Sequence, residues 1–228
     1  MKLGVLFSGG KDSCYALHKA SKEHEIACLL SIESANPDSY MFHTPNISLT
    51  ALQAKAMNIP IIIKKSEGVK EQELKDLRLL IKSAKTKHKI KGIVTGAIAS
   101  VYQASRIQKI CDSLNLWCFN PLWQKNQMEL LNEIIKNDFN AIITKVSAYP
   151  FDESFLGRKI DPQLIRKLIY YQLKYKINPA GEGGEYETLV LDAPLFKKEL
   201  LIKESQQEYS NHNGTLIIKN AELKDKEK

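Results

Sequence analysis

The amino-acid sequence predicts an α/β protein in which a five-stranded parallel sheet has helices on both faces and is followed by a smaller α+β domain. The sheet is predicted because short apolar runs alternate with helical patterns through the first 120 residues. This repeated β-α order implies parallel strands joined by right-handed crossovers. The second domain is predicted because the alternation stops after Pro121, where irregular stretches and a hairpin pattern follow.

The first half supplies five predicted strands and four predicted helices. The strands are apolar runs at residues 3–7, 26–32, 59–63, 93–95 and 116–119. The helices cover residues 11–22, 48–57, a stretch within 64–91, and 100–114. Ligands of such sheets bind beyond the carboxyl ends of the strands. The loops at residues 8–13, 33–44 and 96–100 are therefore the predicted site.

The second half is predicted to hold a helix at residues 127–136, a strand at 141–146, and a helix that begins at Pro162 with Asp161 as its cap. A strand follows at residues 189–191. A hairpin then pairs residues 200–204 with 215–218 around a turn near Asn213 and Gly214. We place a domain boundary near Asn120, which divides the chain into an ATP-binding domain, 1–120, and a substrate-binding domain, 121–228. No linker is visible, so the halves should pack together.

Most of the positive charge lies in one segment. Residues 64–91 hold ten Lys or Arg and four Asp or Glu, a net +6 of the chain's +7. Apolar residues recur there at helical spacing, which predicts an amphipathic helix with a basic outer face. That face is either a solvated surface or a docking face for an acidic or RNA-bearing partner. The apolar positions are Val69, Leu74, Leu77, Ile81 and Ala84.

The composition argues against a membrane protein and against a disulfide or zinc framework. No run of 18 apolar residues occurs, and the N-terminal segment lacks the pattern of a signal peptide. The four cysteines have neither CxxC nor zinc-ligand spacing. Reduced, buried thiols in a cytoplasmic protein are the expectation that fits this usage. The cysteines are Cys14, Cys28, Cys111 and Cys118.

The segment SGGKDS joins the first predicted strand to the first helix at residues 8–13. It is not a Walker loop, because that pattern needs Gly at position 5 and Ser or Thr at position 12, where this chain has Val and Asp. It is not GxGxxG either, because Gly9 and Gly10 are adjacent and no third Gly follows. The segment still suits an anion, since its glycines let N–H groups approach a phosphate, a helix begins there, and Lys11 adds charge.

In this position SGGKDS resembles the pyrophosphate loop, or PP-loop, of the ATP pyrophosphatases. These enzymes cleave ATP between its α and β phosphates and form an adenylated intermediate. The resemblance implies a Rossmann-like sheet of the HUP type, with ATP as the nucleotide and Lys11 stabilising the leaving pyrophosphate. Asp12 would cap the helix or hold a phosphate-bound Mg²⁺. The implied phosphate contacts are Ser8, Gly9, Gly10, Lys11, Asp12 and Ser13.

Three further stretches narrow the substrate. They are NPDSYMFHTPN at 36–46, GAIASVYQASRIQKIC at 96–111, and GEGGEYETLVLDAPLF at 181–196, the last preceded by PLW at 121–123 and FLGRKID at 155–161. Together with SGGKDS they resemble the diphthine–ammonia ligase family over roughly residues 1–196. The resemblance implies ATP-dependent amidation of diphthine, a modified histidine of translation elongation factor 2, to diphthamide, with ammonium as nitrogen donor.

Candidate nucleotide contacts follow the second and fourth strands. Ser34 and His43 lie where adenosine would sit beside the phosphate loop, although His43 is equally compatible with a hydrogen-bonded loop histidine. Gly96 ends a strand that faces the same crevice, where a side chain would obstruct a nucleotide. An arginine on the next helix would either hold a phosphate or carboxylate bidentately or lie on the surface. The substrate candidates on that helix are Tyr102, Gln103 and Arg106.

The motif GEGGEYET, residues 181–188, is the second candidate site. Three carboxylates crowd into six residues, which costs free energy unless a cation is bound. If the motif is extended, alternation places Glu185 and Glu187 on one face. Mg²⁺, ammonium and the trimethylammonium group of diphthine are candidate cations, and Tyr186 or Trp123 would offer the last an aromatic face. The predicted substrate residues here are Trp123, Glu182, Gly183, Gly184, Glu185, Tyr186, Glu187 and Thr188.

The predicted reaction needs a base that deprotonates ammonium, and Glu185 or Glu187 is the candidate. Free ammonium is the expected nitrogen source, because no cysteine lies in a nucleophile-like turn. Two other functions stay open: a tRNA-modifying ATP pyrophosphatase, and a non-catalytic nucleotide-binding regulator of the stress-protein type. Nucleic acid is disfavoured as a partner because no RNA-binding domain is evident, and a homodimer is left open.

Overall fold

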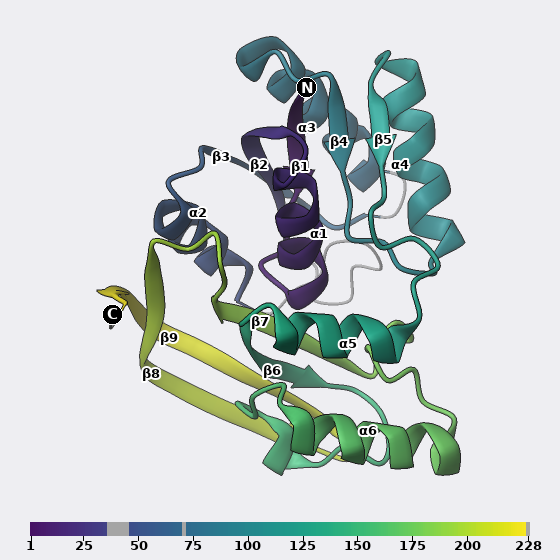
Figure 1. The fold of residues 1–228 in the computed structure, drawn as a ribbon, viewed down its shortest axis with the longest axis vertical. Coiled ribbons are helices and arrows are strands. Elements are labelled where there is room, and N and C mark those ends of the chain that lie inside the picture. Colours follow the sequence, from purple (N-terminus) through teal and green to yellow (C-terminus); the bar gives the residue numbers. More distant parts are fainter. Residues whose placement is uncertain (36–45, 70–71, 227–228) are drawn as a thin grey trace.

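The computed structural model describes residues 1–35, 46–69 and 72–226. It contains two sheets, one in each half of the chain, which lie one above the other in Figure 1. The first sheet has five strands in the order β3-β2-β1-β4-β5, and every neighbouring pair is parallel. The second sheet has four strands in the order β7-β6-β9-β8, and every pair is antiparallel. The predicted α/β class, with its five-stranded parallel sheet, is confirmed.

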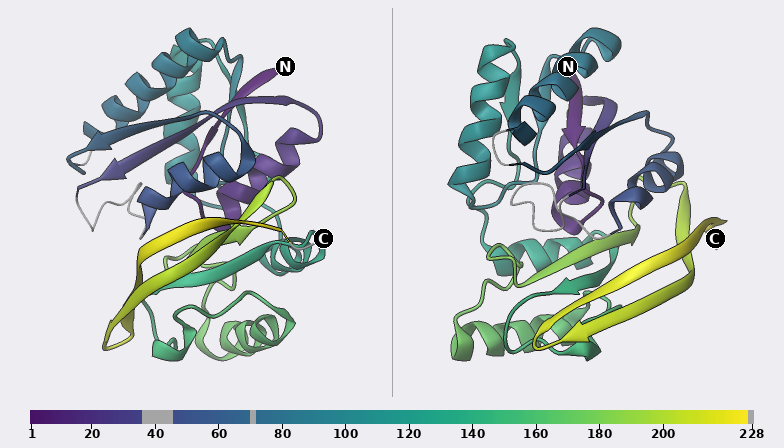
Figure 2. Two further views of the ribbon diagram at one scale, coloured as in Figure 1. Left: turned by 90° about the vertical axis from the view of Figure 1, so that its left-hand side faces the viewer. Right: turned by 180° about the vertical axis from the view of Figure 1, so that it is seen from behind.

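Helices cover both faces of the parallel sheet. One face packs against α1 and α2, and the other packs against α3 and α4 (Figures 1 and 2). The strands are β1 (Lys2–Leu6), β2 (Glu25–Ser34), β3 (Ile61–Ser66), β4 (Gly92–Val94) and β5 (Trp117–Phe119). The helices are α1 (Lys11–Ser21), α2 (Thr50–Met57), α3 (Gln72–His88) and α4 (Val101–Ser113), with a 3-10 turn, η1 (Ile47–Leu49), before α2.

The second half places two helices against the antiparallel sheet. The side chains of Asn126 and Asp161 cap these helices by accepting backbone N–H groups, and Pro162 begins the second helix as predicted. The helices are α5 (Gln127–Lys136) and α6 (Pro162–Tyr175), and a 3-10 turn, η2 (Glu153–Phe155), lies between them. The strands are β6 (Asn140–Val146), β7 (Tyr186–Asp192), β8 (Lys198–Ser210) and β9 (Asn213–Asp225).

The hairpin of β8 and β9 differs from the sequence prediction. Its strands have 13 residues each, and the turn residues are Asn211 and His212, both with positive φ, which come just before the Asn213 and Gly214 that marked the predicted turn. Gly214 belongs to β9, where an added Cβ would lie 2.7 Å from the Tyr209 ring and 3.0 Å from the Glu208 carbonyl oxygen. The glycine therefore reflects close packing. The strands were underestimated because their outer halves are exposed and polar.

The two halves share one hydrophobic core. It runs from the side chains of α1 and α2 to those of α5, α6 and the antiparallel sheet. Backbone bonds also cross between the halves: the Val190 N–H donates to the Gly9 carbonyl (3.0 Å) and the Lys197 N–H to the Ala56 carbonyl (2.7 Å). The expectation that the halves pack together is confirmed, and this packing brings the start of β7 to the phosphate loop.

The basic segment forms an amphipathic helix, α3, as predicted. Its side chains Leu77, Ile81 and Ala84 are buried against the sheet, but Val69 precedes the helix and is exposed. Within the described ranges, no helix is long and apolar enough to cross a membrane. All four cysteines are free thiols, three of them buried and Cys118 partly exposed.

Candidate active site

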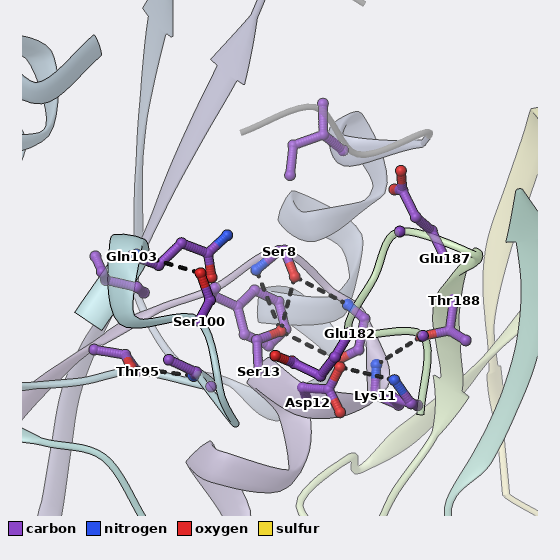
Figure 3. Close-up of a pocket in the computed structure, with 18 of the residues that line it drawn as sticks. Ser8, Lys11, Asp12, Ser13, Thr95, Ser100, Gln103, Glu182, Glu187 and Thr188 are labelled. Atoms are coloured by element: carbon purple, nitrogen blue, oxygen red, sulfur yellow. Dashed lines mark hydrogen bonds and ion pairs between the residues drawn. The ribbon is translucent and has the colours of Figure 1, made fainter. Parts of the chain in front are cut away.

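A pocket of about 640 Å³ lies where the carboxyl ends of β1, β2 and β4 meet the loop before β7 (Figure 3). One side is the phosphate loop, and another is the GEGGEYET motif. Two residues of β6 and its following loop, Lys145 and Ser147, also line it. The apolar part of the lining is drawn mainly from β2, α3 and α4: Leu30, Ile32, Leu77, Leu80 and Ile107.

The phosphate loop is folded by its own serines. The Ser8 N–H donates to Ser13 Oγ (3.3 Å), and Ser13 Oγ donates to the Gly10 carbonyl (3.1 Å). Helix α1 begins at Lys11, so the N–H groups of its first turn point toward the pocket end of the loop. This arrangement has the geometry that favours an anion at a helix N-terminus.

Gly9 is fixed by a residue that the sequence analysis did not select. Its φ is +79°, and an added Cβ would lie 2.3 Å from Oε1 of Gln53. Gln53 is fully buried on α2, and its Nε2 donates to the carbonyl oxygens of Gly9 (3.0 Å) and Val190 (2.8 Å). Gly9 itself does not line the pocket. A glutamine among the apolar positions of the helix pattern TALQAKAM, beside Ala54 and Met57, was the available signal for this contact.

Lys11 joins the two predicted motifs. Its backbone N–H donates to Thr188 Oγ1 (3.0 Å), and its buried Nζ forms an ion pair with Asp12 Oδ2 (2.8 Å) and donates to the Ala180 carbonyl. The same Nζ lies 5.4 Å from the centre of the Tyr186 ring. SGGKDS and GEGGEYET are therefore parts of one site, although 177 residues separate Lys11 from Thr188.

Asp12 and Glu182 form the acidic part of the pocket. Oδ1 of Asp12 is buried and accepts no hydrogen bond from the described residues. The Glu182 carboxylate accepts the Ala99 N–H (3.1 Å), and Figure 3 shows it beside Asp12 and Ser13. Burial raises the pKa of Glu182, and the charge of Asp12 raises it further. A cation at Asp12 Oδ1 would satisfy that atom and reduce the repulsion.

The residues present fit a magnesium ion that arrives with a nucleotide. Nowhere in the described ranges do three His, Cys, Asp or Glu side chains converge as a metal cluster. A protein-only metal cage is thus not what the site resembles. Mg²⁺ commonly binds through one or two carboxylates together with substrate phosphates, and Asp12 Oδ1 offers one such ligand beside the phosphate loop.

The carboxylates Glu185 and Glu187 differ in position. Glu185 does not line the pocket: its Oε1 accepts the Asn178 N–H (2.7 Å) and Nδ2 (2.9 Å), and its Oε2 accepts the Gly183 N–H (2.8 Å). Glu187 lines the pocket and pairs with Lys145 across the strands, at 3.6 Å. The expected common face is therefore not observed, because Glu185 precedes β7 and closes the turn instead of extending the strand.

Burial also distinguishes Glu187 chemically. It raises the pKa of the Glu187 carboxyl to about 7, even though the Lys145 charge lowers it. A carboxylate with a pKa near neutrality can exchange a proton at physiological pH. Of the two base candidates, Glu187 has both the location and the acidity for that exchange.

Tyr186 and Gly96 have structural tasks. The Tyr186 hydroxyl donates to the Pro179 carbonyl (2.6 Å), and Tyr186 also lines the pocket. Gly96 lines the pocket, but an added Cβ would first meet the backbone of Asp12 and Ser13, at 2.9 Å. The physical reason for Gly96 is thus close packing on the start of α1, before any nucleotide is considered.

Other predicted residues divide into those in the pocket and those outside it. Gln103 lines the pocket on α4, whose cap is Ser100, another lining residue. Ser34, Tyr102, Arg106 and Trp123 do not line it. The Arg106 guanidinium lies 3.5 Å from the centre of the Tyr102 ring. His43 lies outside the described residues. The predicted residues in the lining are Ser8, Gly10, Lys11, Asp12, Ser13, Gly96, Gln103, Glu182, Gly183, Gly184, Tyr186, Glu187 and Thr188.

Comparison with known proteins gives the family. Two family models match, "Diphthamide synthase N-terminal domain" over residues 1–117 and "Diphthamide synthase C-terminal domain" over 126–223. The diphthine–ammonia ligase of Bos taurus is 38% identical over an alignment of 229 positions, which covers 90% of this chain and 84% of the bovine protein. This chain belongs to the diphthine–ammonia ligase family. The Homo sapiens member is equally similar, at 38% identity over the same shares.

Two further similar proteins are either much longer than this chain or only weakly similar to it in structure. The Schizosaccharomyces pombe diphthine–ammonia ligase is 35% identical over 244 residues, covering 99% of this chain but 40% of the yeast protein. A solved structure described as a predicted subunit of tRNA methyltransferase, from Methanocaldococcus jannaschii, aligns with a TM-score of 0.42 and 16% identity over 85% of this chain and 98% of its own. Membership of the diphthine–ammonia ligase family confirms the predicted ligase class, whereas the individual residue roles stay predictions.

Proposed function

We propose that this diphthine–ammonia ligase family member converts diphthine on translation elongation factor 2 to diphthamide, in the cytoplasm. ATP and ammonium would be consumed, and AMP and pyrophosphate released. Diphthine and ammonia are proposed as substrates because the relatives are diphthine–ammonia ligases. One structural observation carries the proposal: Lys11 N–H bonds to Thr188 Oγ1 at 3.0 Å, so a phosphate loop and a carboxylate-rich motif share one pocket.

The first step would be adenylation of the diphthine carboxylate. A carboxylate oxygen attacks the α-phosphorus of ATP, and the bond to the α,β-bridging oxygen breaks. Pyrophosphate leaves with that electron pair toward the phosphate loop, where the start of α1 and the Lys11 charge favour the growing negative charge. The protein's task is positioning and charge neutralisation, and no covalent bond to the enzyme is needed. Mg²⁺, when bound, would neutralise phosphate charge, and Asp12 Oδ1 would hold it.

The second step would be amide formation. Ammonium must lose a proton before its nitrogen can attack the acyl adenylate, and Glu187 is the base that the geometry favours. Collapse of the tetrahedral adduct releases AMP and a second proton. Glu185 would position the Gly183 backbone through its hydrogen bonds and take no proton.

The test is a reconstitution with MgATP, ammonium and elongation factor 2 that carries diphthine. AMP, pyrophosphate and the acid-to-amide mass change of the substrate peptide are followed together. AMP and amide that appear only with all three components would support the ligase. AMP without amide would indicate another acceptor, with tRNA tested next. No AMP under any condition would contradict catalysis and favour a nucleotide-binding regulator.

A further inference from the structure

Lys145 and Ser147 form a corner of the pocket that none of the sequence motifs covers. Both line the pocket from one side of the chain, whereas the intervening Val146 and the preceding Thr144 are fully buried. Across the antiparallel ladder, Lys145 is directly opposite Glu187. The corner thus presents a cation, a hydroxyl and a carboxylate on adjacent strands.

The two lysines of the pocket are held very differently. In the described lining, Lys11 and Lys145 are the only cations. Lys11 is 3% exposed, and its ammonium is already engaged by Asp12 at 2.8 Å and by the Ala180 carbonyl. Lys145 contacts Glu187 at 3.6 Å, which is longer than the roughly 2.7–2.9 Å of a charge-assisted hydrogen bond. Lys145 is therefore the cation that can change partners without dismantling the loops.

Its position separates Lys145 from the phosphate loop. The Glu187 carboxylate points away from Lys11 and Asp12 (Figure 3), and Lys145 is on the Glu187 side. A negative group held there would face the nucleotide from the far side of the pocket. Adenylation needs such a group, because the attacking carboxylate and the triphosphate repel each other until a cation neutralises one of them.

We infer that Lys145, with the neighbouring Ser147, is the binding subsite for the acceptor carboxylate, and that Lys145 leaves Glu187 when the acceptor enters. This inference rests on the proposed function and adds the acceptor subsite to it. Lys145 holds the carboxylate while one of its oxygens bonds to the α-phosphorus and pyrophosphate departs. Adenylation consumes that negative charge, and Glu187, released from its lysine, is then available to take the ammonium proton. The move of Lys145 from Glu187 to the acceptor carboxylate would thus make adenylation precede amide formation.

Acceptor-dependent exchange of labelled pyrophosphate into ATP, without ammonium, measures adenylation alone. The variants are Lys145→Met, which removes the charge, Lys145→Arg, which keeps it, and Glu187→Gln. Lys203→Met is the matched control, because Lys203 also pairs with a glutamate on the neighbouring strand, Glu222 at 2.6 Å, but on the exposed hairpin. We expect Lys145→Met to lower the exchange rate on the order of 100-fold, with ATP affinity unchanged within about twofold.

The remaining variants complete the test. Lys145→Arg should recover most of the exchange, and Glu187→Gln should exchange pyrophosphate but form little amide. If Lys145→Met fails to fold, the double variant Lys145→Met with Glu187→Gln, which leaves no unpaired carboxylate, replaces it. Near-normal exchange in Lys145→Met, or in the double variant that replaces it, overturns the inference. An equal loss of ATP binding also overturns it, because that result would assign Lys145 to the phosphates. Absence of exchange in the unmodified protein would instead refute the proposed function itself.

Discussion

The pocket has a floor and a wall that are held in different ways. The floor is the phosphate loop, residues 8–13, with Gln53 and Thr188; the wall is Lys145, Ser147 and Glu187. In the floor, Gln53 binds two carbonyl groups and Thr188 binds the Lys11 N–H at distances of 2.8–3.0 Å. In the wall, the one ion pair is 3.6 Å long and its members are partly exposed. The short hydrogen bonds of the floor can hold a ligand in a fixed position, whereas Lys145 and Glu187 in the wall can separate and bind other groups.

One motif contains both kinds of residue. Glu185 accepts three hydrogen bonds from Asn178 and Gly183 and is 8% exposed. Glu187, two residues later, has Lys145 at 3.6 Å as its one ion-pair partner among the described residues, and burial raises its pKa to about 7. Neighbouring carboxylates therefore need not share a role: hydrogen bonds give Glu185 a structural role, whereas Glu187, which is paired with Lys145 instead, can exchange a proton.

The largest expected effect comes from Glu187→Gln. Without the carboxylate that accepts the ammonium proton, we expect amide formation to slow by roughly 10²–10⁴-fold, while acceptor-dependent release of pyrophosphate in the first turnover persists. Rapid-quench measurement of amide and pyrophosphate in the same samples checks both. Equal loss of amide and pyrophosphate would contradict the assignment of Glu187 to the second step.

Glu185→Gln is the matched control for that variant. It keeps the side-chain volume but replaces one acceptor oxygen with a donor NH₂, facing N–H groups of Asn178 or Gly183. We expect a loss of stability of about 1–3 kcal/mol and a smaller change in the amide-to-pyrophosphate ratio, measured by urea unfolding and the same assay. A stable Glu185→Gln protein that releases pyrophosphate in the first turnover without forming amide would reverse the two roles.

Gln53→Leu tests the floor. The substitution keeps a similar volume but removes the donor to Gly9 and Val190, so two buried carbonyl contacts are lost. We expect the free energy of unfolding to fall by about 2 kcal/mol, and ATP binding to weaken because Gly9 belongs to the phosphate loop. Calorimetry of ATP binding and urea unfolding measure the two effects. Gln172→Leu, on an exposed position of α6, is the control and should leave both unchanged. Normal stability in Gln53→Leu would show that the floor does not depend on this contact.

The floor was easier to predict from sequence than the wall. SGGKDS is a local pattern, and its strand–loop–helix geometry follows from adjacent residues. Lys145 occurs within AIITKV, where nothing local distinguishes a pocket lysine from a solvated one. Its place depends on the β6–β7 register, which pairs residues 42 positions apart. Gln53 is similar, because its partners Gly9 and Val190 meet only after the halves pack.

Predictions from local sequence patterns were wrong where contacts with residues outside the pattern determined the conformation. Alternation places Glu185 and Glu187 on one face only if the motif is extended, but the strand starts at Tyr186 and Glu185 accepts the Gly183 N–H within the turn. Gly214 was interpreted as a turn residue, yet its neighbours Tyr209 and Glu208 require it inside the strand. The inner strands β1, β2 and β4 of the parallel sheet, by contrast, contain apolar runs that are buried on both faces, which is why their order along the chain could be predicted.

The pH dependence should be steeper for the wall than for the floor. Because the Glu187 carboxyl is protonated below its pKa of about 7, single-turnover amide formation should rise with pH through about 7 and then level off. ATP binding, which depends on the floor, should change little over that interval. Measuring both between pH 6 and pH 8 makes the comparison direct. A parallel change in ATP binding would mean that the pH effect is not local to Glu187.

The smallest expected effect concerns His18, which lies on α1 beneath the floor and packs against Phe139 and Tyr15. Burial lowers its pKa below 6.5, and the charge of Lys22 lowers it further. The unfolded chain therefore binds the proton first as the pH falls, so His18 decreases the free energy of unfolding below about pH 6.5 and has no effect above it. Glu187 acts in the opposite direction, because its raised pKa makes the folded chain bind protons first below about pH 7.

Urea unfolding of the unmodified protein and of His18→Leu separates these contributions, since both proteins contain Glu187. The leucine variant should lose less stability between pH 7.5 and pH 5.5, and the difference between the two curves belongs to His18. His88, whose pKa burial also lowers but which is only half-buried, provides the control, and His88→Gln should alter the slope less. Parallel curves for the unmodified and leucine proteins would contradict a buried, neutral His18.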